Sequence, residues 1–295
     1  MPVAQPGIFA QGTRSHRHLE FDSNDGVTPE ALLEALRGLR QPSVTAGGAN
    51  IVVGFRASLW EELDPNARGV GDFTFPVLDG VANTPHDVWV WTHGTGEDVM
   101  LDVARAVAAL LAPVAHLATD VAGFVYHDGR DLTGFIDGTE NPVVEEANTA
   151  AIVPDGQPGA GGAYAITQRW VHDLAAFHAL AVDDQERVFG RTKPDSVELD
   201  GTAKPANAHI ARVVIEEDGE ELEIYRRSVP YGQVAELGLY FVAFSADHTR
   251  FDKMLRRMFG HSGDGLHDHL TDFSRPVSGA AYFVPSVEAL GDVLA

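Results

Sequence analysis

The first half of the chain alternates short apolar runs with longer segments in which apolar residues recur every three or four positions. Short runs of this kind predict strands, and the longer spacing predicts amphipathic helices. Strands are predicted at residues 18–21, 51–53, 88–91 and 121–126. One helix is predicted to begin after Thr28, a capping residue followed by Pro29, and a second to span residues 97–111. The resulting order, βαββαβ, is that of the ferredoxin-like unit.

The second half of the chain repeats this order less regularly. Strands are predicted at residues 164–171, 213–215, 222–225, 239–244 and 281–284, and helical segments at 174–180, 185–189 and 249–259. Asp218-Gly219, between two of these strands, is a hairpin signal. We therefore expect an α+β fold of two ferredoxin-like domains, residues 1–150 and residues 151–295. The Pro- and Gly-rich stretch 154–162, or the residues just before it, marks the expected division.

Composition narrows the class of protein. Hydrophobic residues make up 44% of the 295 residues and charged residues 22%, so the chain can bury a full core and is not disordered. The 43 acidic residues outnumber the 21 Lys and Arg, which gives a formal net charge of −22. Such a surface repels phosphate backbones and anionic lipids, so we expect neither nucleic acid nor a membrane as a partner.

The chain has no cysteine. This excludes disulfides, thiolate nucleophiles, iron–sulfur clusters and thiolate ligation of haem. Residues 1–14 lack the basic start and apolar run of a signal peptide. The most apolar stretch, residues 99–125, is interrupted by charged residues and a proline, so no membrane span is expected. We expect a cytoplasmic protein.

The segment Gly134-Phe135-Ile136-Asp137-Gly138 places one carboxylate between two glycines. Because glycine tolerates backbone angles and close approaches that a Cβ forbids, such a loop can lie against a flat ligand and direct one acid at it. An Asp-Gly pair alone more commonly marks a turn. The chemical interpretation therefore depends on residues further along the chain.

Two downstream segments supply that context. His209 begins the segment His209-Ile210-Ala211, and Arg226 stands four residues before Pro230-Tyr231-Gly232. With the 134–142 loop, this ordered set resembles the B-type branch of the dye-decolourising peroxidase family. The family's G-x-x-D-G loop is matched by Gly134, Asp137 and Gly138, its haem-ligating histidine by His209, and its arginine by Arg226. One position departs: many B-type members carry Asn two residues after the arginine, and this chain has Ser228.

The resemblance implies a haem b enzyme of the dimeric α+β barrel type, with haem mainly in the C-terminal half. His209 is then the axial ligand of the haem iron, and Asp272 is our candidate for the acceptor of its other N–H. Asp137 is expected to move a proton during peroxide cleavage, Arg226 to stabilise the developing negative charge, and Ser228 to help place peroxide. The residues expected to contact the cofactor are Asp137, Gly138, Thr139, Glu140, Asn141, His209, Arg226 and Asp272.

The function implied by the resemblance is a haem peroxidase that uses H2O2, through a ferryl intermediate, to oxidise dyes, phenols and similar one-electron donors. A homo-oligomer is expected from the resemblance. A haem storage, delivery or iron-release protein would share the fold and His209 but needs neither Asp137 nor Arg226. A metal-dependent hydrolase built on His261, His267 and His269 is the third hypothesis, although these histidines do not form an H-E-x-x-H motif.

Overall fold

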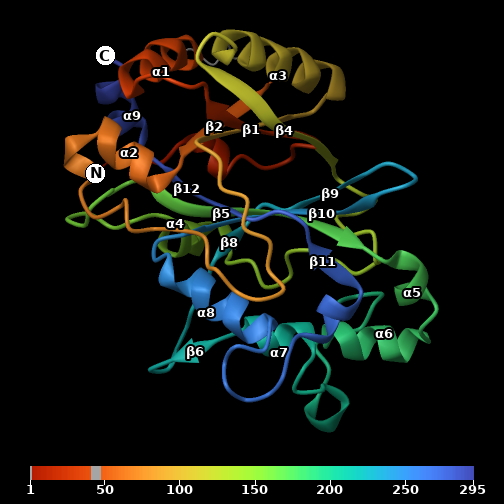
Figure 1. The fold of residues 1–295 in the computed structure, drawn as a ribbon. Coiled ribbons are helices and arrows are strands. Elements are labelled where there is room, and N and C mark those ends of the chain that lie inside the picture. Colours follow the sequence, from red (N-terminus) through yellow and green to blue (C-terminus); the bar gives the residue numbers. More distant parts are fainter. Residues whose placement is uncertain (1, 41–47) are drawn as a thin grey trace.

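The computed structural model describes residues 2–40 and 48–295 (Figure 1). Its strands are β1 (Ser15–Ser23), β2 (Asn50–Phe55), β3 (Val88–Gly94), β4 (Ala115–Phe124), β5 (Ala163–His172), β6 (Glu216–Glu217), β7 (Glu220–Glu221), β8 (Tyr225–Arg226), β9 (Val229–Gly232), β10 (Leu237–Ser245), β11 (Ser274–Pro276) and β12 (Ala280–Val284). Its α-helices are α1 (Pro29–Leu36), α2 (Ala57–Leu63), α3 (Glu97–Leu111), α4 (Val144–Ala151), α5 (Leu174–His178), α6 (Val182–Phe189), α7 (His209–Val213), α8 (Thr249–Met258) and α9 (Val287–Val293).

Ten of the strands in this part of the chain form one sheet, in the order β11-β5-β12-β2-β3-β1-β4-β9-β10-β8. Strand β5 also pairs with β10, so the sheet closes on itself as a barrel. The first four strands lie in the order β2-β3-β1-β4, and the later ones in the order β12-β5-β10-β9. Both orders are those of a ferredoxin-like unit, which confirms the predicted α+β fold.

Helices cover the barrel from opposite sides (Figure 1). Helices α1 and α3 lie on one side, and α5, α6, α7 and α8 lie on the other. One hydrophobic core fills the space between the outer face of the sheet and these helices; it includes Leu19, Phe55, Leu111, Ile166 and Phe251. No helix in the described ranges is long and apolar enough to cross a membrane.

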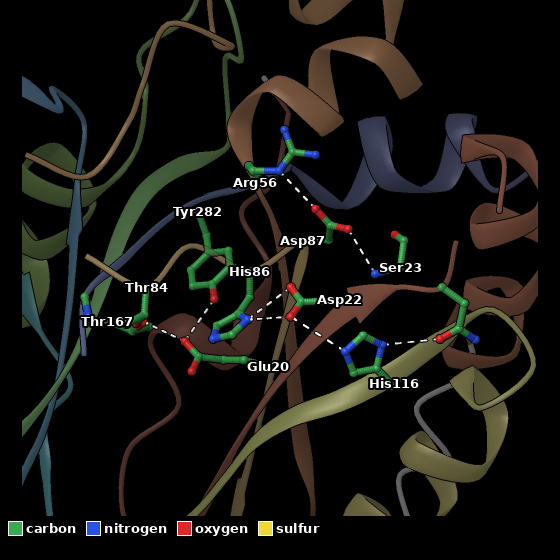
Figure 2. Close-up of polar contacts among 12 residues, drawn as sticks. Glu20, Asp22, Ser23, Arg56, Thr84, His86, Asp87, His116, Thr167 and Tyr282 are labelled. Atoms are coloured by element: carbon green, nitrogen blue, oxygen red, sulfur yellow. Dashed lines mark hydrogen bonds and ion pairs between the residues drawn. The ribbon is translucent and has the colours of Figure 1, made fainter. Parts of the chain in front are cut away.

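The barrel interior is packed with rings. His18 and Tyr240 stack with their centroids 4.1 Å apart, and Trp89 and Trp91 continue the stack; all four residues are fully buried. The buried carboxylate of Glu20 lies among them. It accepts hydrogen bonds from Thr167 at 3.0 Å and from Tyr282 at 2.9 Å (Figure 2). The interior is therefore a solid aromatic and polar core, distinct from the outer core.

Several predicted elements are confirmed in detail. Helix α3 has the predicted bounds, and Thr28 caps α1 by accepting a hydrogen bond from the Ala31 N–H. The predicted strand at residues 213–215 is wrong, and the one at 222–225 is confirmed only at Tyr225, where β8 begins. The first region belongs to the end of α7 and an irregular segment, and the hairpin is confined to β6 and β7 around Asp218-Gly219. The apolar side chains that suggested strands face a large cavity instead.

Candidate active site

A cavity with an apolar wall lies between the outer faces of β5 and β10 and the helices α7 and α8. It has an empty volume of about 1420 Å³, part of which opens to solvent. Most of its wall is apolar, from Ile166, Leu239, Phe241, Met254 and Met258 among others. A cavity with this lining is suited to a flat, largely apolar ligand of several rings.

His209 lines this cavity at the first residue of α7. Its Nδ1 donates a hydrogen bond to Oδ2 of Asp268 at 2.7 Å, and Asp268 is fully buried. The other oxygen of Asp268 accepts the Leu270 N–H at 2.9 Å, which fixes the orientation of the carboxylate. Because the carboxylate can only accept, Nδ1 carries the proton and Nε2 remains free to bind a metal.

The expectation that Asp272 accepts this proton is wrong. Asp272 lies on the surface and pairs with His267 at 3.0 Å. The chain enters the core at Asp268, whose N–H donates to the Met258 carbonyl, and the turn over residues 269–272 then directs Asp272 outward. Sequence reasoning missed Asp268 because aspartates at 264, 268 and 272 all flank the same histidines, and only tertiary contacts distinguish them.

The backbone conformation of the Asp137 loop is the one predicted from its glycines. Gly134 and Gly138 have φ values of 90° and 77°, which residues with a Cβ rarely adopt. The Asp137 N–H donates to the Gly129 carbonyl at 3.0 Å, and its side chain opens into the cavity. Burial of the carboxylate by the surrounding protein raises the pKa of Asp137, an effect that the positive charge of Arg226 opposes.

Arg226 reaches the same cavity from β8. Its guanidinium is buried, and burial lowers its pKa while Asp137 and Glu221 oppose the shift. Arg227, its neighbour in the sequence, faces the other way, as alternation along a strand requires, and donates to the carbonyls of Ile8 and Ala10.

The contact between Asn141 and the cofactor stays a prediction, and the structure shows the Asn141 side chain paired with the backbone of Arg226. Its side-chain amide donates to the Arg226 carbonyl and accepts the Arg226 N–H, both at 2.8 Å. The two bonds pair the backbone C=O and N–H of Arg226, as hydrogen bonds from a neighbouring strand would. Asn141 therefore positions Arg226, and it lies outside the lining of the large cavity.

A second cavity meets the first at Asp137, Gly138 and Arg226, which line both. Ser228 lines the second cavity, and its hydroxyl accepts the Val242 N–H at 3.3 Å. The three predicted catalytic residues are thus brought together around one junction, with Ser228 on the far side of it from the apolar cavity.

Arg191 is a cavity residue that sequence reasoning missed. It forms ion pairs with Glu140 and Glu198, and its Nε is buried without a hydrogen-bond partner among the described residues. The Nε of Arg226 is buried and unpartnered in the same way. Thr139 and Glu140 line the same wall as predicted. Two arginines with unused donors fit a ligand that carries carboxylates, and His209 Nε2 fits a metal at its centre.

The histidines proposed for a hydrolase do not converge. His261 contacts the Asp79 carbonyl, while His267 and His269 face Asp272. Among residues 2–40 and 48–295 the side chains form no group of three His, Asp or Glu arranged to hold a metal ion. The hydrolase hypothesis therefore loses its structural basis.

The fold and the site together define an α+β protein built to hold an acid-bearing metal macrocycle against one histidine. The sequence model of "Dyp-type peroxidase, C-terminal" matches residues 128–289. A dye-decolorizing peroxidase of Rhodococcus erythropolis is 39% identical over 302 residues, which is 99% of this chain and 86% of that protein. The chain belongs to the dye-decolourising peroxidase family.

Solved structures agree with this assignment. A dyp-type peroxidase protein from Shewanella oneidensis superposes with a TM-score of 0.92 at 32% identity, covering 99% of both chains. A DypB variant from Rhodococcus jostii RHA1, solved in complex with heme, superposes with a TM-score of 0.91 at 31% identity, covering 99% of this chain and all of that one. The chain is accordingly a haem peroxidase of the B-type branch, and its cofactor is haem.

Proposed function

We propose that this chain reduces H2O2 at the junction of its two cavities and oxidises small one-electron donors such as phenols and dyes, with His209, Asp137 and Arg226 in distinct roles. The observation that carries the proposal is that the cavity in which His209 keeps its Nε2 free also holds an acid and an arginine side by side. A haem storage or delivery protein has no use for that acid–arginine pair.

The cavity residues divide into those that hold the cofactor and those that act on peroxide. His209 Nε2 would bind the haem iron, and Arg191 has a free Nε donor for one of the haem carboxylates. When bound, the haem supplies the iron at which peroxide is reduced. Asp268 keeps the imidazole of His209 oriented and electron-rich by accepting its Nδ1 proton.

Asp137 and Arg226 act on the peroxide. An ionised Asp137 carboxylate accepts the proton from the inner oxygen of peroxide and returns it to the outer oxygen, which leaves as water. Arg226 remains protonated at any working pH, so it cannot serve as the base. Its guanidinium stabilises the negative charge that develops on the departing oxygen.

We extend the proposal to the setting of the enzyme. The net charge of −22 supports a protein that works apart from nucleic acid and anionic membranes, and we propose a cytoplasmic location. We also propose a homo-oligomer and a division into domains at residues 1–150 and 151–295. The strand orders on the two sides of that division support it.

Replacement of the axial ligand tests the assignment. His209→Ala should lose tight haem retention and the Soret band while keeping the fold, as judged by circular dichroism. His267→Ala is the matched control, because His267 lies on the same side of the molecule but pairs with Asp272 on the surface. A His209→Ala protein with a normal haem content would contradict the proposal.

A further inference from the structure

A buried chain of three side chains, all of which also line the apolar cavity, holds the loop that presents Asp137. His172 is the last residue of β5, and it is paired in register with Ser274 of β11. The His172 Nε2 lies 3.1 Å from Oδ1 of Asp131, and its Nδ1 lies 2.7 Å from the Ser274 hydroxyl. Asp131 and Ser274 are both less than 9% exposed.

The chemistry of the partners fixes the direction of both hydrogen bonds. A carboxylate only accepts, so Nε2–H donates to Asp131. In the neutral imidazole Nδ1 then accepts, and the Ser274 hydroxyl donates to it. The chain therefore runs from serine to histidine to aspartate, and it ties the carboxylate of Asp131 to two strands of the barrel.

Asp131 organises the loop that begins with it. Its Oδ2 accepts from the N–H of Thr133 at 2.8 Å and from the Thr133 hydroxyl at 2.5 Å. Its own N–H donates to the Phe135 carbonyl at 2.9 Å, and its carbonyl accepts the Gly134 N–H at 2.9 Å. The loop is thus closed around Asp131.

Backbone hydrogen bonds connect Asp131 and its turn to Asp137. Arg130 and Ile136 form an antiparallel bridge, and the Asp137 N–H donates to the Gly129 carbonyl at 3.0 Å. A displacement of Asp131 is therefore transmitted along paired backbone to the residue that faces the cavity. Arg130 adds a second attachment, to the carbonyls of Lys193 and Pro194, but this one leads to a surface segment and not to the barrel.

We propose that His172, with Ser274 behind it, is a positioning residue for peroxide cleavage: it anchors Asp131 to the barrel and thereby fixes the loop that presents Asp137. The inference rests on the proposed role of Asp137 as the proton carrier. It is supported by the electrostatics of the site, because His172 lowers the pKa of Asp131, and the negative charge of Asp131 in turn contributes to the raised pKa of Asp137. The other charged groups that act on Asp137 are Arg226 and His209.

The test compares three replacements of the anchor in the haem-loaded enzyme. His172→Leu removes both hydrogen bonds and should lower kcat/KM for H2O2 about tenfold or more, the usual range for loss of such a supporting group. The KM for a phenolic donor should stay unchanged. His172→Gln keeps an N–H that reaches Asp131 and should recover most of the lost rate. Ser274→Ala should give a smaller loss of the same kind.

Two controls separate positioning from folding. His178→Leu makes the same exchange at an exposed histidine of α5 and should leave the rates unchanged. Asp131→Asn should move the acid limb of the kcat/KM profile for H2O2 to lower pH, because it removes a negative charge that raises the pKa of Asp137. Asp173→Asn, at an exposed residue next to His172 that caps α5, should not move it.

The outcomes distinguish a failure of the positioning role of His172 from a failure of the proposed catalytic role of Asp137. If Asp137→Asn cleaves peroxide at the wild-type rate, the proposed role of Asp137 fails. If Asp137→Asn is impaired, two other results would each overturn only the positioning role of His172. One is a His172→Leu enzyme with full haem and the wild-type rate. The other is a His172→Gln enzyme that is as slow as His172→Leu. If His172→Leu does not retain haem, the rate of Ser274→Ala decides, and a wild-type rate in that variant overturns the inference.

Discussion

His209 and Asp268 are 59 residues apart in the sequence, yet their side chains meet at 2.7 Å with the carboxylate fully buried. A buried anion that accepts the Nδ1 proton gives the imidazole part of the character of an imidazolate. Such a ligand donates more electron density through Nε2 and favours the higher oxidation states of the iron it binds. A peroxidase gains from this arrangement, since its iron must be oxidised by peroxide.

Asp268→Asn should therefore raise the reduction potential of the haem, on the order of tens of millivolts, where 59 mV is tenfold for a one-electron couple. Haem should still bind, since His209 is intact. Spectroelectrochemical titration measures the shift. Asp272→Asn removes a carboxylate that pairs with a surface histidine and serves as the control. Equal potentials in the wild type and Asp268→Asn would contradict the expected role of the anion.

Arg226→Leu should slow the reaction with H2O2 by about 10²- to 10³-fold, because removing one preorganised donor costs about 2.7–4 kcal/mol of transition-state stabilisation. Stopped-flow mixing of the haem-loaded enzyme with H2O2 measures the rate. Arg227→Lys is the contrasting change: Arg227 ties the segment at Ile8 and Ala10, so its replacement should lower the melting temperature without slowing the reaction. A wild-type rate in Arg226→Leu would remove the arginine from the mechanism.

The rate of the peroxide reaction should rise with pH through the pKa of Asp137, since only the ionised carboxylate accepts a proton. Burial raises that pKa, so the rise should lie above the range of an ordinary aspartate. Arg226 lowers the pKa of Asp137, so Arg226→Leu should move the rise to still higher pH, in addition to lowering the plateau. Rates that depend on pH identically in the two proteins would show that another group controls the step.

The buried histidines of the barrel should make the protein sensitive to acid. Burial lowers the pKa of His16 to about 4 and that of His93 to about 2, whereas both are near 6.5 in the unfolded chain. The unfolded chain then binds more protons below pH 6.5, so the free energy of unfolding falls as the pH is lowered. The loss is about 1.4 kcal/mol per pH unit for each histidine, and it ends for each group below its folded pKa.

His18→Phe isolates one contribution to this acid sensitivity. Neither ring nitrogen of His18 has a hydrogen-bond partner among the described residues, and burial lowers its pKa well below the usual range. Phenylalanine keeps the stack on Tyr240 and takes up no proton, so stability at pH 7 should be equal or higher, and the slope below pH 6.5 should be shallower by about one proton. Denaturant unfolding at several pH values gives both quantities; an unchanged slope would contradict the prediction.

The net charge of −22 should make the oxidation of anionic dyes depend on salt. Added salt screens the repulsion between the acidic surface and the dye, so the rate with an anionic dye at neutral pH should increase. A neutral phenol feels no such repulsion, and its rate should stay constant. Steady-state rates at about 10 mM and about 150 mM salt compare the two conditions, across which the screening length falls from roughly 30 to 8 Å.

The sequence predicted the parts of the site that local chemistry determines. The glycines of the Asp137 loop indicated its backbone conformation, and Thr28 indicated a helix start. The parts that it missed depend on which distant segments meet. The choice of Asp268 over Asp272 is determined by where the chain re-enters the core after α8.

Other features were missed for the same reason. Arg191 comes shortly after α6 and carries no local motif, and it is recognised only by its unpartnered Nε at the cavity wall. The closure of the sheet depends on β5 pairing with β10, which lies more than sixty residues further along the chain. The apolar residues 213–215 looked like a strand because a cavity wall and a sheet face demand the same side chains.

The two seams of the barrel have a consequence for how such proteins can change. Within the described residues, β12 meets β2 at the pair Phe283–Phe55, and β4 meets β9 at the pair Gly123–Tyr231. Side chains inside the barrel also join the first four strands to the later ones, as Glu20 does with Thr167 and Tyr282 (Figure 2). A chimera that takes one half of the barrel from a relative therefore keeps compatible strands but combines interior side chains that do not fit each other. In such a chimera the residues at the positions of Thr167 and Tyr282 must be matched to the residue at the position of Glu20.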